Sequence, residues 1–238
     1  MEFSVVIPAK NESGNVGPLV AEIRAACDGR YDYELIYIDD GSTDDTVAKL
    51  QALKAGGFSR LRILRHEQSC GQSTAVRSGV KAARAPWIVT LDADGQNDPA
   101  DIPKLFEAAR GTPSVGVVAG WRRKRQDTWL KRISSKIANQ VRGGLLNDGT
   151  PDTGCGLKCF SREGFLELPY FDHMHRYLPA LYRRAGHGVA IVEVNHRPRG
   201  AGQSNYGLHN RLWVGIVDLF GVIWLQRRAK LPKYLGEL

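Results

Sequence analysis

Short apolar runs alternate with longer amphipathic segments along the first half of the chain. The short runs are rich in Val, Ile and Leu, which is typical of strands buried on both faces of a sheet. They predict five strands, at residues 3–7, 34–38, 61–64, 87–91 and 115–119. Because helical patterns separate these runs, the chain is expected to form βαβ units, whose strands are parallel.

The segments between the strands repeat apolar residues with the spacing of an α-helix. They predict helices at residues 14–27, around Val47, Leu50 and Leu53, at 73–83 and at 99–109. Further along, the pattern predicts a helix with His173 and His175 near its start, a strand at 189–194 and a long helix at 208–229. The predicted fold class is α/β, a doubly wound, mostly parallel sheet with helices on both faces and a C-terminal amphipathic helix.

Composition and charge narrow the class of protein. The chain has 238 residues, of which 42% are hydrophobic, and this supports a substantial core and argues against disorder. It carries 33 Lys and Arg against 25 Asp and Glu, a net charge of +8. An excess of positive charge favours an anionic partner, which could be nucleic acid, a membrane surface or a phosphorylated substrate.

The cysteines and the apolar segments indicate a location. Cys155 and Cys159 lie close together, but two thiols without two further ligands do not make a zinc site, so free thiols in a reducing compartment are expected. The first residues show no secretory signal. The longest apolar stretch, residues 212–225, is shorter than the ~20 residues that span a bilayer. We expect a cytoplasmic protein that is peripheral at the cytoplasmic face of the membrane.

Polar residues follow four of the predicted strands, at residues 8–12, 39–42, 70–72 and 92–96. In an open α/β sheet, the loops at the carboxyl ends of the strands converge on one crevice, where ligands bind. Asp92 and Asp94 are one residue apart directly after a strand, so both carboxylates could hold a divalent cation that neutralises a diphosphate. The alternative is a simple polar turn, which also favours Asp and Gly.

Motifs for other nucleotide chemistry are missing from the sequence. No G-x-x-x-x-G-K-[ST] motif follows any predicted strand, and no G-x-G-x-x-G motif follows the first. Hydrolysis of nucleoside triphosphates and dinucleotide redox chemistry are therefore disfavoured, and a nucleotide-diphosphate substrate is expected.

Three motifs stand in order along the chain: VVIPAKNE at residues 5–12, IDDGSTDDT at 38–46 and LDADGQNDP at 91–99, followed by Gly120, Trp121 and Arg122 at a strand exit. Together they resemble the motifs of glycosyltransferase family 2, in particular those of the polyprenyl-phosphate (dolichol-phosphate mannose synthase-like) sugar transferases. The resemblance covers roughly residues 2–210. It implies a GT-A-like fold and a metal-dependent glycosyltransferase that moves one sugar from a nucleotide-diphosphate-sugar to a polyprenyl phosphate.

The resemblance also implies roles for individual residues. Nucleotide contacts are expected at Pro8, Lys10, Glu12, Ile38, Asp40, Asp92 and Ala93. Mg²⁺ or Mn²⁺ is expected at Asp92, Asp94 and Gln96, and the acceptor phosphate at Arg122, Lys131, Arg132 and Ser135. Asp94 and Arg122 are the expected catalytic residues. We divide the chain into a nucleotide-sugar-binding catalytic domain, residues 1–205, and a C-terminal helix, residues 206–238, for contact with a membrane surface or a partner.

Two positions depart from the family pattern. Lys10 stands where an aromatic residue is frequent, and Asn205 replaces a lysine that usually follows Gly-x-Ser. If that lysine helps to neutralise the diphosphate, either Arg197 or Arg199 must take its place or the reaction is slower. The expected partners are a UDP- or GDP-sugar, a polyprenyl phosphate lipid, and a membrane surface or a membrane-embedded partner subunit, without nucleic acid.

Alternatives remain open from the sequence. A phosphate acceptor is anionic near neutral pH, because its second pKa is about 6, and needs no strong general base. A saccharide acceptor would need one, for which Asp152 is the candidate.

A third hypothesis is a nucleic-acid-binding module built on the basic residues between Arg122 and Lys136, but paired carboxylates in a phosphate-binding groove argue against it. The apolar stripe of the last helix fits either protein packing or a membrane surface.

Overall fold

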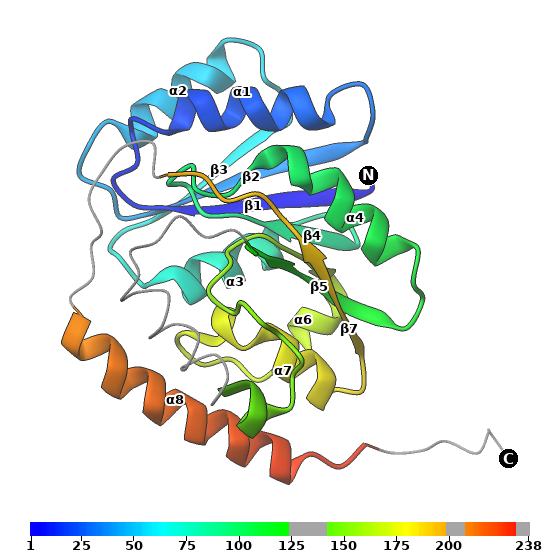
Figure 1. The fold of residues 1–238 in the computed structure, drawn as a ribbon. Coiled ribbons are helices and arrows are strands. Elements are labelled where there is room, and N and C mark those ends of the chain that lie inside the picture. Colours follow the sequence, from blue (N-terminus) through cyan, green and yellow to red (C-terminus); the bar gives the residue numbers. More distant parts are fainter. Residues whose placement is uncertain (124–141, 199–207, 232–238) are drawn as a thin grey trace, which may run out of the picture.

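A computed structural model describes residues 1–123, 142–198 and 208–231. One seven-stranded sheet forms the centre of the molecule (Figure 1). Its strands are β1 (Phe3–Ala9), β2 (Tyr33–Asp40), β3 (Leu61–His66), β4 (Trp87–Thr90), β5 (Val115–Trp121), β6 (Lys158–Ser161) and β7 (Gly188–Glu193). The helices are α1 (Val16–Cys27), α2 (Thr46–Ala55), α3 (Gln72–Ala82), α4 (Ile102–Arg110), α6 (Arg162–Leu166), α7 (Leu178–Arg184) and α8 (Leu208–Arg228), with short 3₁₀ turns η1 (Pro99–Asp101) and η2 (Met174–Arg176).

The strand order is β3-β2-β1-β4-β6-β5-β7. Pairing is parallel throughout except at β6, which runs antiparallel to both of its neighbours, β4 and β5. The predicted mostly parallel sheet is therefore confirmed. The apolar pattern does not predict β6, because only two of its four residues are apolar and its first residue is a lysine.

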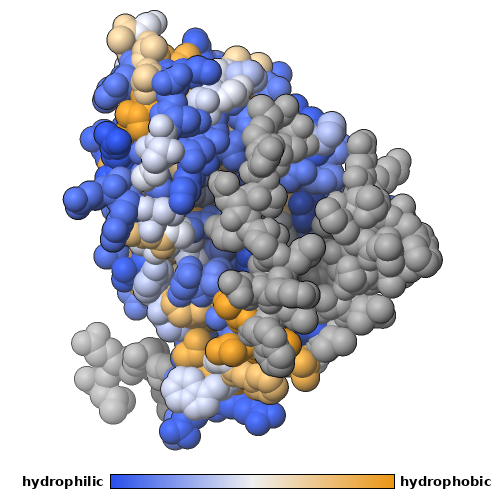
Figure 2. Space-filling view, turned by 90° about the vertical axis from the view of Figure 1, so that its left-hand side faces the viewer, coloured by the Kyte–Doolittle hydropathy of each residue, from blue (hydrophilic) through white to orange (hydrophobic). Residues whose placement is uncertain are grey.

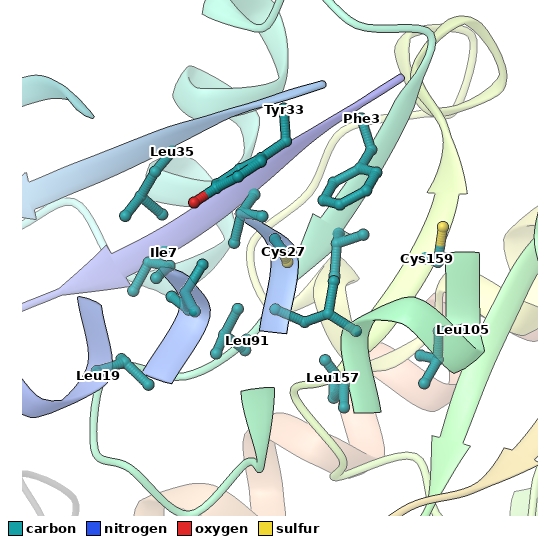
Figure 3. Packing of buried hydrophobic residues seen from close by; sticks show 14 of the residues in the cluster. Phe3, Ile7, Leu19, Cys27, Tyr33, Leu35, Leu91, Leu105, Leu157 and Cys159 are labelled. Atoms are coloured by element: carbon teal, nitrogen blue, oxygen red, sulfur yellow. The ribbon is translucent and has the colours of Figure 1, made fainter. Parts of the chain in front are cut away.

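Helices cover both faces of the sheet, as predicted. Helices α1, α2 and α4 pack on one face with Phe3, Ile7, Leu35 and other buried side chains (Figures 1 and 3). On the other face α3, α6, α7 and α8 enclose a second apolar cluster around Phe160 and Tyr182. Because an apolar core covers each face of the sheet, both faces are shielded from water. The sequences of the parallel strands are therefore continuous apolar runs.

Several helix ends differ from the predicted ones. The helix expected to carry His173 and His175 near its start begins later, at Leu178, and His175 lies in the preceding η2 turn. A proline at the second position of α7 suits a helix start, because the missing amide has no partner there anyway. The segment expected to begin at Pro99 opens with η1, where the Asp98 side chain accepts a hydrogen bond from the amide of Ala100.

The C-terminal helix α8 has two different faces. Val222 is buried, and Leu219 and Ile223 pack against the second apolar cluster. Phe220 and Trp224, from the same predicted stripe, are instead exposed. Within the described parts of the chain, a search for a helix able to span a bilayer finds no candidate.

Candidate functional site

The loops that follow β1 and β2 are tied to each other. The amide of Asn11 donates to Oγ of Ser42 at 2.9 Å, and the amide of Thr43 donates to the Asn11 side chain at 2.8 Å. The amide of Glu12 donates to Thr46 at 2.9 Å. The two loops therefore form one unit at the carboxyl edge of the sheet, where the sequence predicts nucleotide contacts.

Asp40, a predicted nucleotide contact, fastens this unit to the loop after β3. Its Oδ1 accepts a hydrogen bond from the amide of Cys70 at 2.9 Å and lies 2.8 Å from Nδ1 of His66. Its Oδ2 accepts from Oγ of Ser69 at 2.8 Å and from the amide of Gly71 at 3.0 Å. Burial opposes ionisation of Asp40, but these hydrogen bonds outweigh it and lower the pKa of the carboxyl group.

The remaining predicted nucleotide residues lie at different depths. Lys10 is exposed, and Pro8 and Glu12 are half-buried. Ile38 is fully buried among the apolar side chains beneath α3, so its side chain faces the core and not the edge. Ala93 is also buried. A nucleotide at this edge could meet Lys10 and Glu12 through their side chains, whereas the Ile38 and Ala93 side chains support the loops from below.

Asp92 is held from three sides at the end of β4. Nε2 of Gln72, the first residue of α3, donates to Oδ1 of Asp92 at 2.8 Å, and the amide of Asp92 donates to the Asn97 side chain at 3.0 Å. Gly156 packs so closely that a Cβ there would lie 2.2 Å from Oδ2 of Asp92. Only glycine leaves room for the carboxylate in this place.

Asp94 lies next to Asp92 and is also fixed by its own loop. Its Oδ1 accepts from the amide of Gln96 at 3.0 Å, and the carbonyl of Gln96 accepts from the amide of Arg197 at 3.1 Å. The Arg197 guanidinium donates to Glu22 at 2.7 Å and to the carbonyl of Asn97 at 3.0 Å. Arg197 therefore borders the Asp94 loop, whereas Arg199 and Asn205 lie outside the described residues.

The chemistry of this edge fits a divalent cation. The pKa of Asp92 is raised, first by burial and then by the negative charge of Asp94. Two carboxylates held this close repel each other, and a hard cation with oxygen ligands relieves the repulsion. Gln96 is half-buried on the same loop and offers an amide oxygen. The roles of Asp92, Asp94 and Gln96 as metal ligands remain predictions.

Arg122 lies directly after β5 and is locked to Asp152. Its Nε and Nη2 donate to the two oxygens of Asp152 at 2.7 and 2.9 Å, and its amide donates to the same carboxylate at 3.3 Å. Both side chains are buried. Burial alone would lower the pKa of Arg122, but the hydrogen bonds and charge of Asp152 raise it, so the guanidinium stays cationic.

This pair forms the second half of the site. In the described parts of the chain, two of the three guanidinium nitrogens of Arg122 donate to Asp152, and its role towards an acceptor phosphate remains a prediction. The other predicted acceptor residues, Lys131, Arg132 and Ser135, lie outside the described residues. Sequence reasoning named Asp152 as a possible base but did not foresee its pairing with Arg122, because the partners are 30 positions apart.

Two further residues lie at the site. Gln72 belongs to the polar residues 70–72 that the sequence places at the crevice, but its hydrogen bond to Asp92 is not predicted. Lys158 of β6 lines a cavity of about 20 Å³ together with Asp92, Gly156 and His175 and is not predicted at all. No local signal identifies Lys158, because its position depends on the antiparallel pairing of β6.

Comparison with known proteins defines the class. The chain resembles the crystal structure of glucosyl-3-phosphoglycerate synthase from Mycobacterium tuberculosis in complex with Mn²⁺, UDP and phosphoglyceric acid, with a TM-score of 0.71 and 22% identity. The match covers 98% of this chain and 80% of that one. The fold is therefore the GT-A-like fold of nucleotide-sugar transferases, as predicted.

Sequence comparison gives the family. The model of Glycosyl transferase family 2 matches residues 4–168, and the chain belongs to this family. Dodecaprenyl-phosphate galacturonate synthase from Rhizobium johnstonii is 34% identical over 243 residues, which cover all of this chain and 71% of that protein. Undecaprenyl-phosphate 4-deoxy-4-formamido-L-arabinose transferase from Aeromonas hydrophila is 34% identical over 206 residues, covering 86% of this chain. The match covers 63% of the Aeromonas protein, which is less than two thirds of its length.

Proposed function

We propose that this protein transfers a single sugar from a nucleotide-diphosphate-sugar to a polyprenyl phosphate, with the help of Mg²⁺ or Mn²⁺. The observation that carries the proposal is the juxtaposition at one sheet edge of an acidic half, Asp92 and Asp94, and a cationic half, Arg122 held by Asp152, since the charges of Asp92 and Arg122 act on each other. The names of the two relatives, both transferases or synthases of polyprenyl-phosphate sugars, support it.

The donor half suits a nucleotide diphosphate. Asp92, Asp94 and Gln96 would hold the cation, which, when bound, neutralises the leaving diphosphate. Lys10 and Glu12 lie on the adjoining loop and would contact the nucleoside. The ordered loops hold these groups in place before substrate arrives, so little reorganisation is needed during the reaction.

The acceptor half favours a phosphate over a sugar hydroxyl. Both oxygens of Asp152 are engaged by Arg122, so Asp152 could act as a general base only if this buried pair opened. A phosphate monoester is already anionic at neutral pH and needs no such base. Arg122 would orient it towards the anomeric carbon, and catalysis then consists of positioning and charge neutralisation.

A transfer assay tests this reaction directly. Purified protein is incubated with MnCl₂, undecaprenyl phosphate and radiolabelled UDP- or GDP-sugars, and the label in the organic phase is counted. We expect an acid-labile, lipid-soluble product that forms only with both the metal and the lipid phosphate. Label in a water-soluble saccharide would favour the alternative acceptor, and no transfer from any donor would refute the proposal.

We also infer that the protein binds the cytoplasmic face of a membrane through the outer face of α8. This outer face consists of Val217, Phe220 and Trp224, which are 68%, 67% and 60% exposed, flanked by Val214 and Ile216. Figure 2 shows hydrophobic side chains gathered along the lower edge of the molecule, where α8 lies. An exposed apolar row on a helix whose opposite face is packed fits insertion into the headgroup region.

Charge supports a lipid surface as the occupant. Arg227, Arg228 and Lys230 are exposed at the end of α8, and the net charge of the chain is +8. Basic residues near an anionic leaflet contribute about 1 kcal/mol each to binding. A membrane at this face would also bring a lipid acceptor to the protein.

Vesicle sedimentation tests the membrane contact. The protein should bind vesicles with anionic phosphatidylglycerol more tightly than neutral phosphatidylcholine vesicles, and Phe220→Glu with Trp224→Glu should abolish binding. Leu166→Glu, an exposed leucine on α6, serves as the matched control. Unchanged binding by the double variant would refute the inference. Loss of a dimer in sedimentation velocity, without any vesicle binding, would assign this face to a second copy.

A further inference from the structure

Strand β6 is the structural link between the two halves of the site. It pairs with β4, which leads to Asp92, and with β5, which leads to Arg122. Lys158, the first residue of β6, is the register partner of Thr90 on one side and of Ala119 on the other. Because β6 is antiparallel, it starts at the edge where its neighbours end, and so Lys158 begins the strand beneath the site.

Lys158 is a buried lysine close to charged groups of both halves. Only 3% of the residue is exposed, and its ammonium group donates to the carbonyl of Cys155. Burial lowers the pKa of Lys158, whereas the negative charges of Asp92 and Asp152 act in the opposite direction. The positive charge of Arg122 acts with burial and lowers the pKa of Lys158 further. A buried lysine persists only where such partners offset the loss of water.

The cavity beside Asp92 identifies Lys158 as its source of positive charge. Lys158, Asp92, Gln72 and His175 line the same space. His175 is neutral, because burial holds its pKa well below the usual value, and Nδ1 of its ring lies 2.7 Å from Oγ of Ser73. Gln72 contributes a neutral amide. Among the described residues of this lining, Lys158 is therefore the group that can balance the carboxylate of Asp92.

We propose that Lys158 is a positioning residue that couples the two halves of the site, holding Asp92 on the donor side and the Arg122–Asp152 pair on the acceptor side from beneath. The proposal rests on the proposed function, since it assigns Lys158 to the same donor and acceptor groups. The role of Lys158 is to hold these groups in place, and it transfers no proton. Without it, the carboxylates of Asp92 and Asp152 share a buried region with one positive partner fewer, and both move.

The test compares Lys158→Met with Lys81→Met, an exposed lysine on α3, and with Gln72→Ala, whose side chain donates a hydrogen bond to Asp92 on the donor side. Mn²⁺ binding in the presence of nucleotide is measured by calorimetry, and the KM for undecaprenyl phosphate is measured separately. Removing a group that orients a metal ligand weakens metal binding about 10- to 100-fold, which is expected for Lys158→Met and Gln72→Ala. A rise in the KM for the lipid phosphate is expected for Lys158→Met but not for Gln72→Ala.

Each outcome decides the proposal. The proposal is overturned if Lys158→Met is folded by circular dichroism and both its Mn²⁺ affinity and its KM for undecaprenyl phosphate lie within twofold of wild type. It is also overturned if Mn²⁺ binding changes but the KM for the lipid does not. If Lys158→Met does not fold, Lys158→Arg and Lys158→Gln are compared, and the charged variant must bind Mn²⁺ more tightly. Equal affinities overturn the proposal. Failure of the proposed function is distinct, because wild-type protein would then bind no Mn²⁺ or transfer no sugar.

Discussion

The donor and acceptor halves of the site are held together by different forces. On the donor side, Asp40 and Asp92 are fixed by hydrogen bonds from neutral groups, among them the amide of Cys70 and the side chain of Gln72, two residues that stay partly exposed. On the acceptor side, Arg122 and Asp152 form an ion pair that is buried. Hydrogen-bonded loops can lose one contact at little cost, whereas a buried charge cannot lose its partner. Substitutions in the donor half should therefore lower activity with little loss of stability, whereas substitutions in the acceptor half should lower both.

Asp94→Ala should have the largest effect on activity. Loss of a carboxylate that holds the cation removes several kcal/mol of transition-state stabilisation, so kcat/KM should fall about 10³-fold. Stability should change little, because the Asp94 side chain accepts a hydrogen bond within its own loop. Radiochemical transfer and thermal unfolding measure the two effects, with the exposed Glu167→Ala as the control. Transfer at the wild-type rate in the presence of a chelator would sink the metal mechanism.

Arg122→Ala, in the acceptor half, should lower both stability and the affinity for the lipid phosphate. It removes the guanidinium that binds both oxygens of the buried Asp152, so the free energy of unfolding should fall by about 3 kcal/mol or more. The KM for the lipid phosphate should rise more than the KM for the nucleotide sugar. Urea unfolding and steady-state kinetics at a temperature where the variant is folded provide the measurements. A stable variant with normal lipid affinity would show that the pair serves neither role.

Gly156→Ala should displace the carboxylate of Asp92 in the donor half. The new Cβ would lie 2.2 Å from Oδ2 of Asp92, so the carboxylate must move. We expect Mn²⁺ binding to weaken about tenfold, as for loss of a group that orients a ligand. Gly17→Ala on α1 is the matched control, because a Cβ there meets no atom within 4 Å. Calorimetry that gives equal affinities for both variants would contradict the close packing.

Asp40→Asn should give the smallest effect, and that effect should depend on pH. The pKa of Asp40 is lowered in the folded protein, so its ionised form contributes stability above the unfolded value of about 3.9. This contribution is lost as the pH falls through the folded pKa. Wild type should thus exceed the variant in stability by about 1 kcal/mol at pH 7. The difference should shrink in urea titrations near pH 3, whereas a constant difference would exclude a charge effect.

The extent of prediction from the sequence also differs between the two halves. Asp40, Asp92 and Asp94 follow parallel strands with strong apolar patterns, so their convergence on one edge could be inferred from strand ends alone. The helix boundaries were less accurate: His175 lies in a 3₁₀ turn rather than in the helix that follows. Local hydrogen bonds and prolines set such ends, and they leave little trace in an apolar pattern.

The acceptor half could not be inferred in the same way. The pairing of Arg122 with Asp152 joins residues 30 positions apart, and the place of Lys158 depends on a four-residue antiparallel strand. Hydrophobic period and turn residues report the nearest neighbours along the chain. They carry no information about which distant charges share a buried region.

The sequence by itself determined the family, the parallel part of the sheet and the acidic donor edge, because apolar periodicity and contiguous motifs are local properties of the chain. The tertiary structure alone decided that β6 is inserted in the opposite direction between β4 and β5. It also decided that α8 buries one face and exposes the other. The direction of β6 and the orientation of α8 depend on contacts between residues far apart in the sequence. The free energy of these contacts is set by the removal of apolar surface and of charges from water.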